Sequence, residues 1–126
     1  MPITINGTTG IAANAGFFSD GYGNLRGVPV TDKSSGYVLI GSDAGRTISV
    51  TTGGVWVPGN IFSPGDNVII YNNSNTSQTI TPNSEVVMFE AANTGNGGAK
   101  TLVGRGIATV YCTSNNTFLI SGAGLS

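Results

Sequence analysis

The apolar residues of this chain fall into short runs separated by clusters of glycine, proline, asparagine and serine. The segment 46–51 shows the pattern, because Ile48 and Val50 alternate with Thr47 and Ser49. Alternation with period two places the apolar side chains on one face of a β-strand. No window of ten or more residues has the period of about 3.6 of an amphipathic helix, and no apolar run approaches the ~20 residues of a membrane-spanning helix. The sequence therefore predicts a β protein with no substantial helix and no membrane partner.

Eight segments have the composition of strands and are bounded by turn residues. They are 36–40, 46–51, 55–57, 68–71, 77–81, 85–90, 106–112 and 117–121. The residues 113–116 between the last two predict a four-residue hairpin loop. Short strands with a turn every eight to twelve residues or so are typical of sandwiches and barrels. We predict an all-β fold, a small antiparallel β-sandwich or jelly-roll-like barrel with an extended N-terminal arm.

Charged side chains are scarce in this sequence. It has five Lys and Arg and six Asp and Glu in 126 residues, where an average domain of this length carries about 31 charges. Five cations cannot form the basic stripe that neutralises phosphates, so we predict no nucleic-acid partner. So few charges also exclude helices with a charged outer face, such as those of coiled coils. Disordered chains combine high net charge with few apolar residues, whereas this chain has low charge and 39% apolar residues. We interpret the deficit as a surface that partners cover, with neutral Thr, Ser and Asn adding to its solubility.

The first thirty residues differ from the rest of the chain. They hold two charges, Asp20 and Arg26, and several glycines. The segment 4–9 is suited to a short Asn-Gly hairpin. We divide the chain into a glycine-rich N-terminal arm, residues 1–30, and a β-sandwich domain, residues 31–126. Either the arm completes the core of its own domain, or it docks on a partner or neighbouring subunit. The candidate contact residues in the arm are Phe17, Phe18, Tyr22 and Leu25, and in the domain Trp56.

The chain has one cysteine, Cys112, so no intrachain disulfide can hold the fold. Cys112 lies in the apolar segment 107–112, which predicts a buried and unreactive thiol. The first residues lack a cationic segment followed by a long apolar run, so we expect no secretory leader and synthesis in a cytosol.

Residues for catalysis are missing from the sequence. It has no histidine, which removes the commonest general base and metal ligand, and one cysteine excludes a thiolate cluster. Glu85 and Glu90 are five residues apart, which places them on opposite faces of one strand. The four Asp residues lie in turn-like contexts, where bonding to nearby backbone is the ordinary role. We therefore expect no enzyme, no catalytic residue, no metal site and no cofactor.

Three functions of different classes remain. The first is a structural protein that assembles around a symmetry axis and docks on a larger lattice. The second is a sugar-binding module, in which Trp56 or a tyrosine provides a stacking surface. The third is an ice-binding protein, suggested by Thr47, Ser49 and Thr51 on one strand face. It would need Thr rows at a fixed repeat, which the sequence lacks.

From Asp32 onward the chain resembles a domain that recurs in virion proteins of tailed bacteriophages, including phages of cyanobacteria. The order and spacing of several stretches, and no single motif, carry this resemblance. The opening residues 1–7 are similar to the starts of such proteins. The other matching stretches are 32–37, 42–48, 63–66 with 68–73, and 104–110 with 118–122.

The resemblance implies a virion component that is made in the host bacterial cytoplasm. It allows a capsid decoration (cement) protein or a part of a tail fibre or tail tip. A fibre needs a long trimeric shaft, whereas this chain has 126 residues, so we favour the decoration protein. The expected partners are two further copies in a homotrimer and the major capsid protein or other virion proteins. A carbohydrate-binding module for receptor recognition is the remaining alternative.

Overall fold

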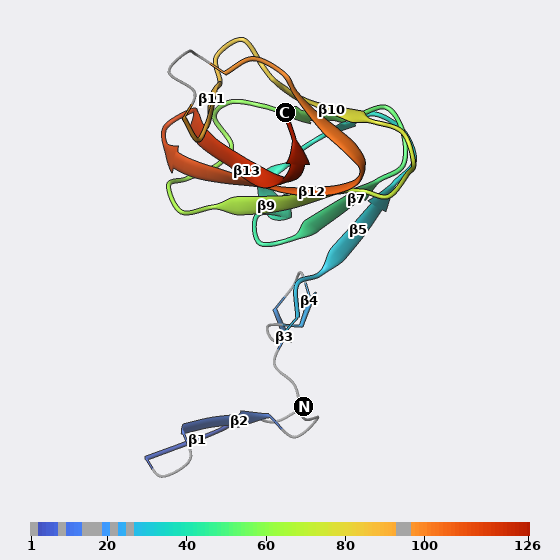
Figure 1. Cartoon of the computed structure of the whole chain (residues 1–126). Helices are drawn as coiled ribbons and strands as arrows, with labels where there is room; N and C mark the ends of the chain where they lie inside the picture. The colour runs from blue at the N-terminus through green and yellow to red at the C-terminus, as the bar shows by residue number, and fades with distance from the viewer. Residues whose placement is uncertain (1–2, 8–9, 14–18, 21–22, 25–26, 93–96) are drawn as a thin grey trace.

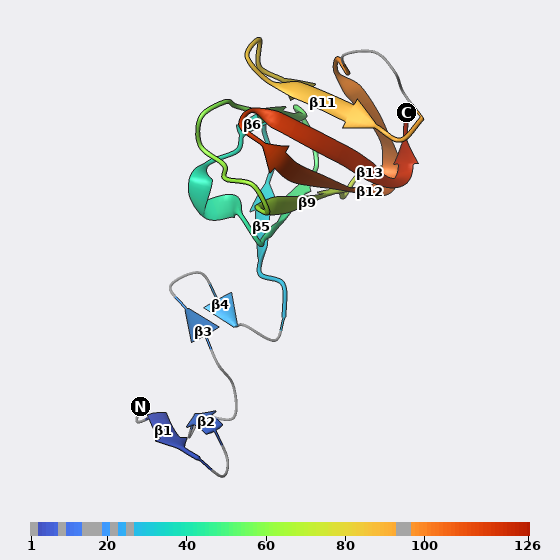
Figure 2. The ribbon, with the colours of Figure 1, turned by 90° about the vertical axis from the view of Figure 1, so that its left-hand side faces the viewer.

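The computed structural model describes residues 3–7, 10–13, 19–20, 23–24, 27–92 and 97–126. In the N-terminal region, β1 (Ile3–Asn6) pairs with β2 (Gly10–Ala13), and β3 (Ser19–Asp20) pairs with β4 (Gly23–Asn24), each pair antiparallel. A hairpin is present near the expected place but in another register: Asn6 is the last residue of β1 and pairs with Gly10, so Asn6-Gly7 is not a two-residue turn. Figures 1 and 2 show both hairpins outside the main sheet.

The main sheet has nine strands and curls into a nearly closed barrel (Figure 1). Its strands are β5 (Val30–Lys33), β6 (Tyr37–Val38), β7 (Thr47–Val50), β8 (Val55–Val57), β9 (Asn67–Asn72), β10 (Gln78–Pro82), β11 (Val87–Glu90), β12 (Lys100–Ser114) and β13 (Thr117–Leu125). Neighbours run in the order β5-β7-β9-β12-β10-β8-β6, and β13 pairs with β12 and β11. The predicted all-β fold is confirmed, and the described residues contain no α-helix and one 3₁₀ turn, Gly41–Asp43.

Three details of the prediction are corrected. The sheet is mixed, not antiparallel throughout: β5, β7 and β9 run parallel, as do β6, β8 and β10, and β11 with β13. Successive strands lie alternately in the β5-β7-β9 side and in the β6-β8-β10 side of the barrel. The chain therefore enters each side in the same direction every time, which makes the strands of that side parallel. The strand β5 was not predicted, since Val30 is its one strongly apolar residue. The last hairpin turns more tightly than expected, because Ser114 already lies opposite Thr117.

The long strand β12 joins the two sides of the barrel. Its first residues pair with β10, whereas residues 107–111 pair with β9. Between these parts the register shifts and Arg105 takes a positive φ of 62°. A bulge of this kind bends a strand and raises its twist. It bends β12 where the sheet has to turn to form the barrel.

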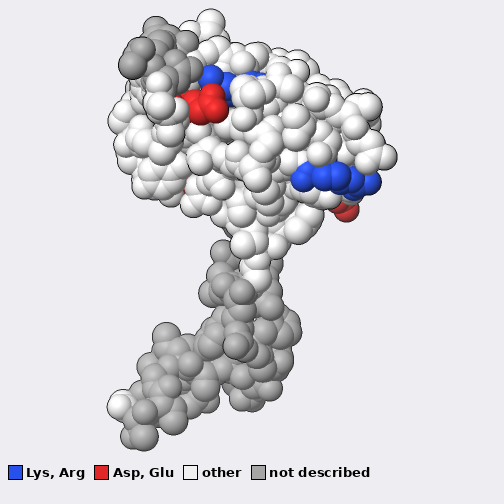
Figure 3. Space-filling model, viewed as in Figure 1, with Lys and Arg blue, Asp and Glu red and all other residues white. Residues whose placement is uncertain are grey.

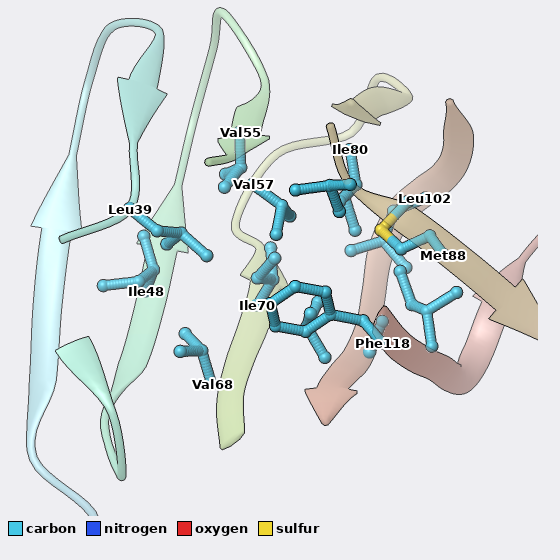
Figure 4. Close-up of a cluster of buried hydrophobic side chains, with 14 of the residues drawn as sticks. Leu39, Ile48, Val55, Val57, Val68, Ile70, Ile80, Met88, Leu102 and Phe118 are labelled. Carbon is cyan, nitrogen blue, oxygen red and sulfur yellow. The ribbon is translucent and has the colours of Figure 1, made fainter. Parts of the chain in front are cut away.

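The core fills the inside of the barrel with aliphatic side chains from nearly every strand (Figure 4). In β9 the pattern is regular, since Val68 and Ile70 are buried and the residues between them are not. Phe62 packs edge-on against Phe118, with ring centroids 5.9 Å apart. The buried hydrophobic residues are Leu39, Ile48, Val50, Val55, Val57, Val68, Ile70, Ile80, Val86, Met88, Leu102, Ala108, Val110, Cys112, Phe118 and Ile120.

Candidate interaction surface

The outer face of the sheet carries an uncharged surface that we call the neutral face. The pairing register sets its side chains in three rows of three or four residues, which together involve five strands. One row is Asn67, Tyr111, Leu119 and Phe89; the next is Thr47, Ile69, Thr109 and Ser121; the third is Tyr71, Ile107 and Ala123.

Large apolar side chains of the neutral face are exposed. Ile107 is 45% exposed, Tyr111 42% and Leu119 41%, and Tyr111 lies directly opposite Leu119. On the other face of β12, Ala108 and Val110 are buried in the core. A strand with apolar residues on both faces is usually covered on both sides. In the single chain β12 is covered on one side only.

Charges lie at the margins of the neutral face. Arg105 donates from Nη1 to Asn73 Oδ1 at 2.5 Å and to Tyr71 Oη at 3.4 Å, beside the third row. Asp32, on β5, lies beyond another margin, in register with Ser49 and so in line with the third row. Lys100 is buried and pairs with Glu90, with 3.1 Å between Nζ and Oε2, on the side of the sheet that faces the core, because their register partners Ile80 and Ile120 are core residues. Figure 3 shows the charges on the viewed side of the barrel in two separate groups, with uncharged atoms over most of the rest of that side.

A second apolar surface lies on β6 and β8, and we call it the β6 patch. It consists of Val38, Ile40, Trp56 and Ile61, which are exposed by 52%, 52%, 37% and 39%. Val38 is the register partner of Trp56, and Leu39 N donates to Trp56 O just beyond β6. The Ile61 backbone lies beside Gly41, next to Ile40 in the chain. The strand β10 separates this patch from β12 in the sheet.

The Trp56 ring packs against the backbone at Gly36, where there is no side chain. A Cβ at Gly36 would come within 3.0 Å of Trp56 Cζ3 and 3.2 Å of the Gly53 carbonyl oxygen. Glycine at position 36 therefore lets the ring pack directly on the chain. This contact holds the indole in place and leaves its outer side exposed.

Of the predicted contact residues, the structure places Trp56, on β8 within the β6 patch. Phe17, Phe18, Tyr22 and Leu25 lie outside the described residues. Ile107, Tyr111 and Leu119 were not among the predicted contact residues, because the segment 107–112 was interpreted as the surroundings of a buried thiol and 117–121 only as a strand. The signal was present in the segment 107–112, where apolar residues occupy both faces of the strand.

Asp43 has a local structural role, as its turn context predicts. Its Oδ2 accepts hydrogen bonds from Ile40 N at 2.9 Å and from Tyr37 Oη at 2.7 Å. Burial and this bond to a carboxylate raise the pKa of Tyr37 to about 12, because both disfavour the phenolate. Lys33 Nζ lies 4.2 Å from the centre of the Tyr37 ring. These contacts link β5 to β6, the two ends of the sheet path.

Asp66 and Cys112 have the surroundings that the sequence predicts, whereas Asp32 and Glu85 do not. Asp66 Oδ2 accepts from Ser63 N at 2.9 Å, as a turn residue does, whereas Asp32 lies on β5 and not in the predicted turn. Glu85 lies outside β11, so it does not share a strand with Glu90. Cys112 is buried as predicted, and burial raises the pKa of its thiol.

Two other kinds of site are absent from the described ranges. They contain no group of three or more His, Cys, Asp or Glu side chains placed to hold a metal ion. No helix in the same residues has the length and apolar character needed to cross a membrane. Comparison of the chain with known protein families, with curated proteins and with solved structures gave no match.

Proposed function

We propose that this chain is a non-enzymatic structural protein of a tailed-phage virion, and that it acts as a homotrimeric capsid decoration protein at the junctions between capsomers. The observation that carries the proposal is the neutral face, where Ile107, Tyr111 and Leu119 are each more than two-fifths exposed. The sequence resemblance to virion proteins supports the same role.

The proposed role follows from the physics of many weak contacts. An uncharged face with apolar and hydroxyl side chains can be covered without dehydrating a charge, which is the costly step in burying polar surface. Subunits of a capsid are already held in place, so each bound copy that spans two of them adds contacts at high effective concentration. A set of such copies resists the outward pressure of the packaged genome although each contact is weak.

In this proposal the N-terminal arm docks on the capsid shell or on the next protomer. Residues 1–30 carry two charges and hold Phe17, Phe18 and Tyr22, which suits a segment that is covered in the assembly. A chain that lacks residues 1–27 should fold and lose its binding to heads. Normal head binding by this truncation would contradict docking through the arm.

The experiment that tests the role uses heads of the encoding phage that lack this protein. The purified chain is added at increasing concentration, and bound protein is measured after the heads are sedimented. We expect saturation at a fixed ratio to the major capsid protein and a higher temperature of head disruption. Heads that bind none of the chain, while intact particles contain it in their tails, would assign it to the tail instead.

A carbohydrate-binding module is the second candidate, and the exposed indole of Trp56 favours it. Aromatic rings that are fixed and open on one side stack on sugar rings through the same apolar contact that they use in interfaces. A glycan array separates the two functions. Saturable glycan binding that is lost in Trp56→Ala supports the carbohydrate-binding module. An array without hits contradicts the module and leaves the structural role as the remaining candidate.

A further inference from the structure

We propose that Arg105 is the anion-binding end of the neutral face, and that it pairs with a carboxylate on an extended segment of another virion protein. This inference rests on the proposed virion role and names the chemistry of the partner that covers the face. Arg105 lies exposed at the bulge of β12. Its guanidinium lies beside the third row of the face, because Nη1 donates to Tyr71 Oη at 3.4 Å.

The guanidinium of Arg105 is held in one orientation by β9 and the residue that follows it. Its Nη1 donates to Tyr71 on β9 and to Asn73 Oδ1 directly after that strand. The backbone N of Arg105 donates to the carbonyl oxygen of Ser74 at 3.1 Å. The buried Asn72 side chain donates to two carbonyl oxygens of β12. The bulge is therefore fixed to β9, and little side-chain freedom is lost when the cation binds a partner.

The cation has donors to spare and no ionic partner in the described part of the chain. Nη1 makes its two bonds to neutral groups, and neither Nε nor Nη2 has an acceptor among the described residues. The one ion pair in those residues joins Lys100 to Glu90. Asp32 lies in line with the third row but two strands from Tyr71, which is about 10 Å at the strand spacing. A carboxylate accepts two parallel bonds from a guanidinium, so it fits the donors that remain.

Covering the neutral face calls for an anion at this end. A partner that covers Tyr71 and Ile107, the register pair of the third row, also removes water from the guanidinium beside them. A cation that loses its water without gaining a partner strongly opposes association. A carboxylate offsets that loss, whereas a neutral or basic segment does not. Charge complementarity therefore selects a partner segment that carries Asp or Glu.

The spacing along β12 gives the pattern that the partner should carry. The first row, with Tyr111 and Leu119, is two row steps from the third, about 13 Å at ~3.3 Å per residue. An extended segment spans this distance in about four residues. The fitting segment therefore has its acidic residue over the third row and an apolar residue about four positions along, over the exposed side chains of the first row. Tyrosine and arginine are both among the residue types that dominate binding energy.

The contact is small, which suits a partner that is already assembled. Rows of up to four residues at ~4.8 Å and three rows at ~6.6 Å give a footprint of roughly 380 Å². This is about half of what each side of a stable interface buries, so the contact belongs to the weak class. On a lattice whose subunits are held in place, repeated weak contacts act together through their effective concentration. The segment is therefore one that the assembled particle presents.

The first experiment identifies the carboxylate by coupling. Arg105→Lys, introduced into the encoding phage, keeps the positive charge and gives position 105 an amine. A water-soluble carbodiimide activates a carboxylate, and an amine in contact with it forms an amide while the carbodiimide leaves as a urea. In intact particles we expect position 105 to be joined to one Asp or Glu of a different virion protein, identified by mass spectrometry of the peptides. Thr101→Lys, at an exposed residue of β12 before the bulge, is the matched control and should give no such link.

The second experiment measures affinity for heads that lack this protein. Arg105→Gln should raise the Kd for heads about tenfold, because a covered charge pair is lost. Added salt should weaken the binding of wild type more than that of the variant. Lys33→Gln is the control for net charge and should bind as wild type does, because Lys33 is the register partner of the buried Val50 and lies outside the neutral face. Circular dichroism checks that each variant is folded.

Other outcomes overturn the inference. If particles that contain the chain show no link at position 105, or a link only to a second copy of this chain or to a sugar, the partner is not a carboxylate of another virion protein. Equal Kd values for wild type and Arg105→Gln refute the pairing and leave the head-binding role standing. A link to a tail protein refutes the capsid role alone, because the carboxylate partner is then found elsewhere in the particle. Particles that contain none of the chain refute both.

Discussion

Replacing Asn72 by Asp tests the buried polar contacts that hold the bend of the barrel. The Asn72 side chain is fully buried. Its Nδ2 donates to the carbonyl oxygens of Thr76 at 2.7 Å, Leu102 at 2.9 Å and Val103 at 3.0 Å, and its Oδ1 accepts from Ser74 Oγ. These bonds join the end of β9, the loop before β10 and the bulged part of β12.

The substitution keeps the shape of the side chain and removes both of its protons. An oxygen in place of Nδ2 would face three carbonyl oxygens without a hydrogen between them. Each buried group that loses its partner costs about 1–3 kcal/mol, so the loss of two donated protons should lower the free energy of unfolding by about 4 kcal/mol at pH 7. With a urea slope of roughly 2 kcal/mol per M, the midpoint should fall by about 2 M.

The pH dependence gives a second, independent readout. The introduced carboxyl should have a pKa above its ordinary value, because burial and the facing carbonyls disfavour its charge. A raised pKa in the folded state means that the variant is least impaired below the unfolded value of about 3.9 and loses stability as the pH rises through the folded pKa.

The assay is urea denaturation followed by Trp56 emission, with wild type and variant at equal concentration. Asn73→Asp is the matched control, since Asn73 is exposed and its Oδ1 already accepts from Arg105. We expect the control to stay within about 0.5 kcal/mol of wild type. The reasoning is refuted if Asn72→Asp costs less than about 1 kcal/mol at pH 7, where the unpaired carbonyls should cost several times that, or if its cost does not change with pH.

Two further predictions concern packing and titration. Gly122→Ala should lower the free energy of unfolding by about 3 kcal/mol or more, because its Cβ would overlap the Ile107 carbonyl oxygen. Gly98→Ala is the control and should change the free energy little, because a Cβ there meets nothing within 4 Å. Equal effects of the two substitutions in thermal unfolding would contradict the close pairing of β12 and β13. One phenolate signal should appear at about pH 12 in an absorbance titration and vanish in Tyr37→Phe, and in Asp43→Asn its pKa should fall toward 10.0. Since the pKa of Tyr37 is raised in the folded state, the contribution of Tyr37 to stability is complete below about pH 10 and is lost as the pH rises through about 12. If the difference in stability between wild type and Tyr37→Phe does not change over this pH range, the raised pKa of Tyr37 is contradicted.

The strands of the barrel could be predicted where side chains alternate. In β7 and β9 the core positions Ile48, Val50, Val68 and Ile70 recur at every second residue, so strand and inner face were both readable. The order of the strands could not be read, because local alternation contains no information on which strand is the neighbour. The parallel pairs form because the chain crosses the barrel between two neighbouring strands. Turn residues in the sequence do not indicate such crossover connections.

The candidate surface was partly readable from the sequence. The charge deficit predicted a covered surface but could not place it, because an absent charge has no position. The six residues 107–112 contained the missing information, since they are apolar at outward as well as inward positions. Only the pairing register shows that Ile107, Tyr111 and Leu119 lie in rows of one continuous face.

The central claim is that this chain decorates a phage head as a trimer in which the neutral face is covered. Imaging intact particles of the encoding phage by cryo-electron microscopy tests it most directly, because location and copy number are seen together. We predict three barrels around each local threefold axis at junctions between capsomers, with Leu119 of each copy covered by its surroundings in the particle. Particles whose heads show no density for the chain, or single barrels with the neutral face open to solvent, would contradict the account.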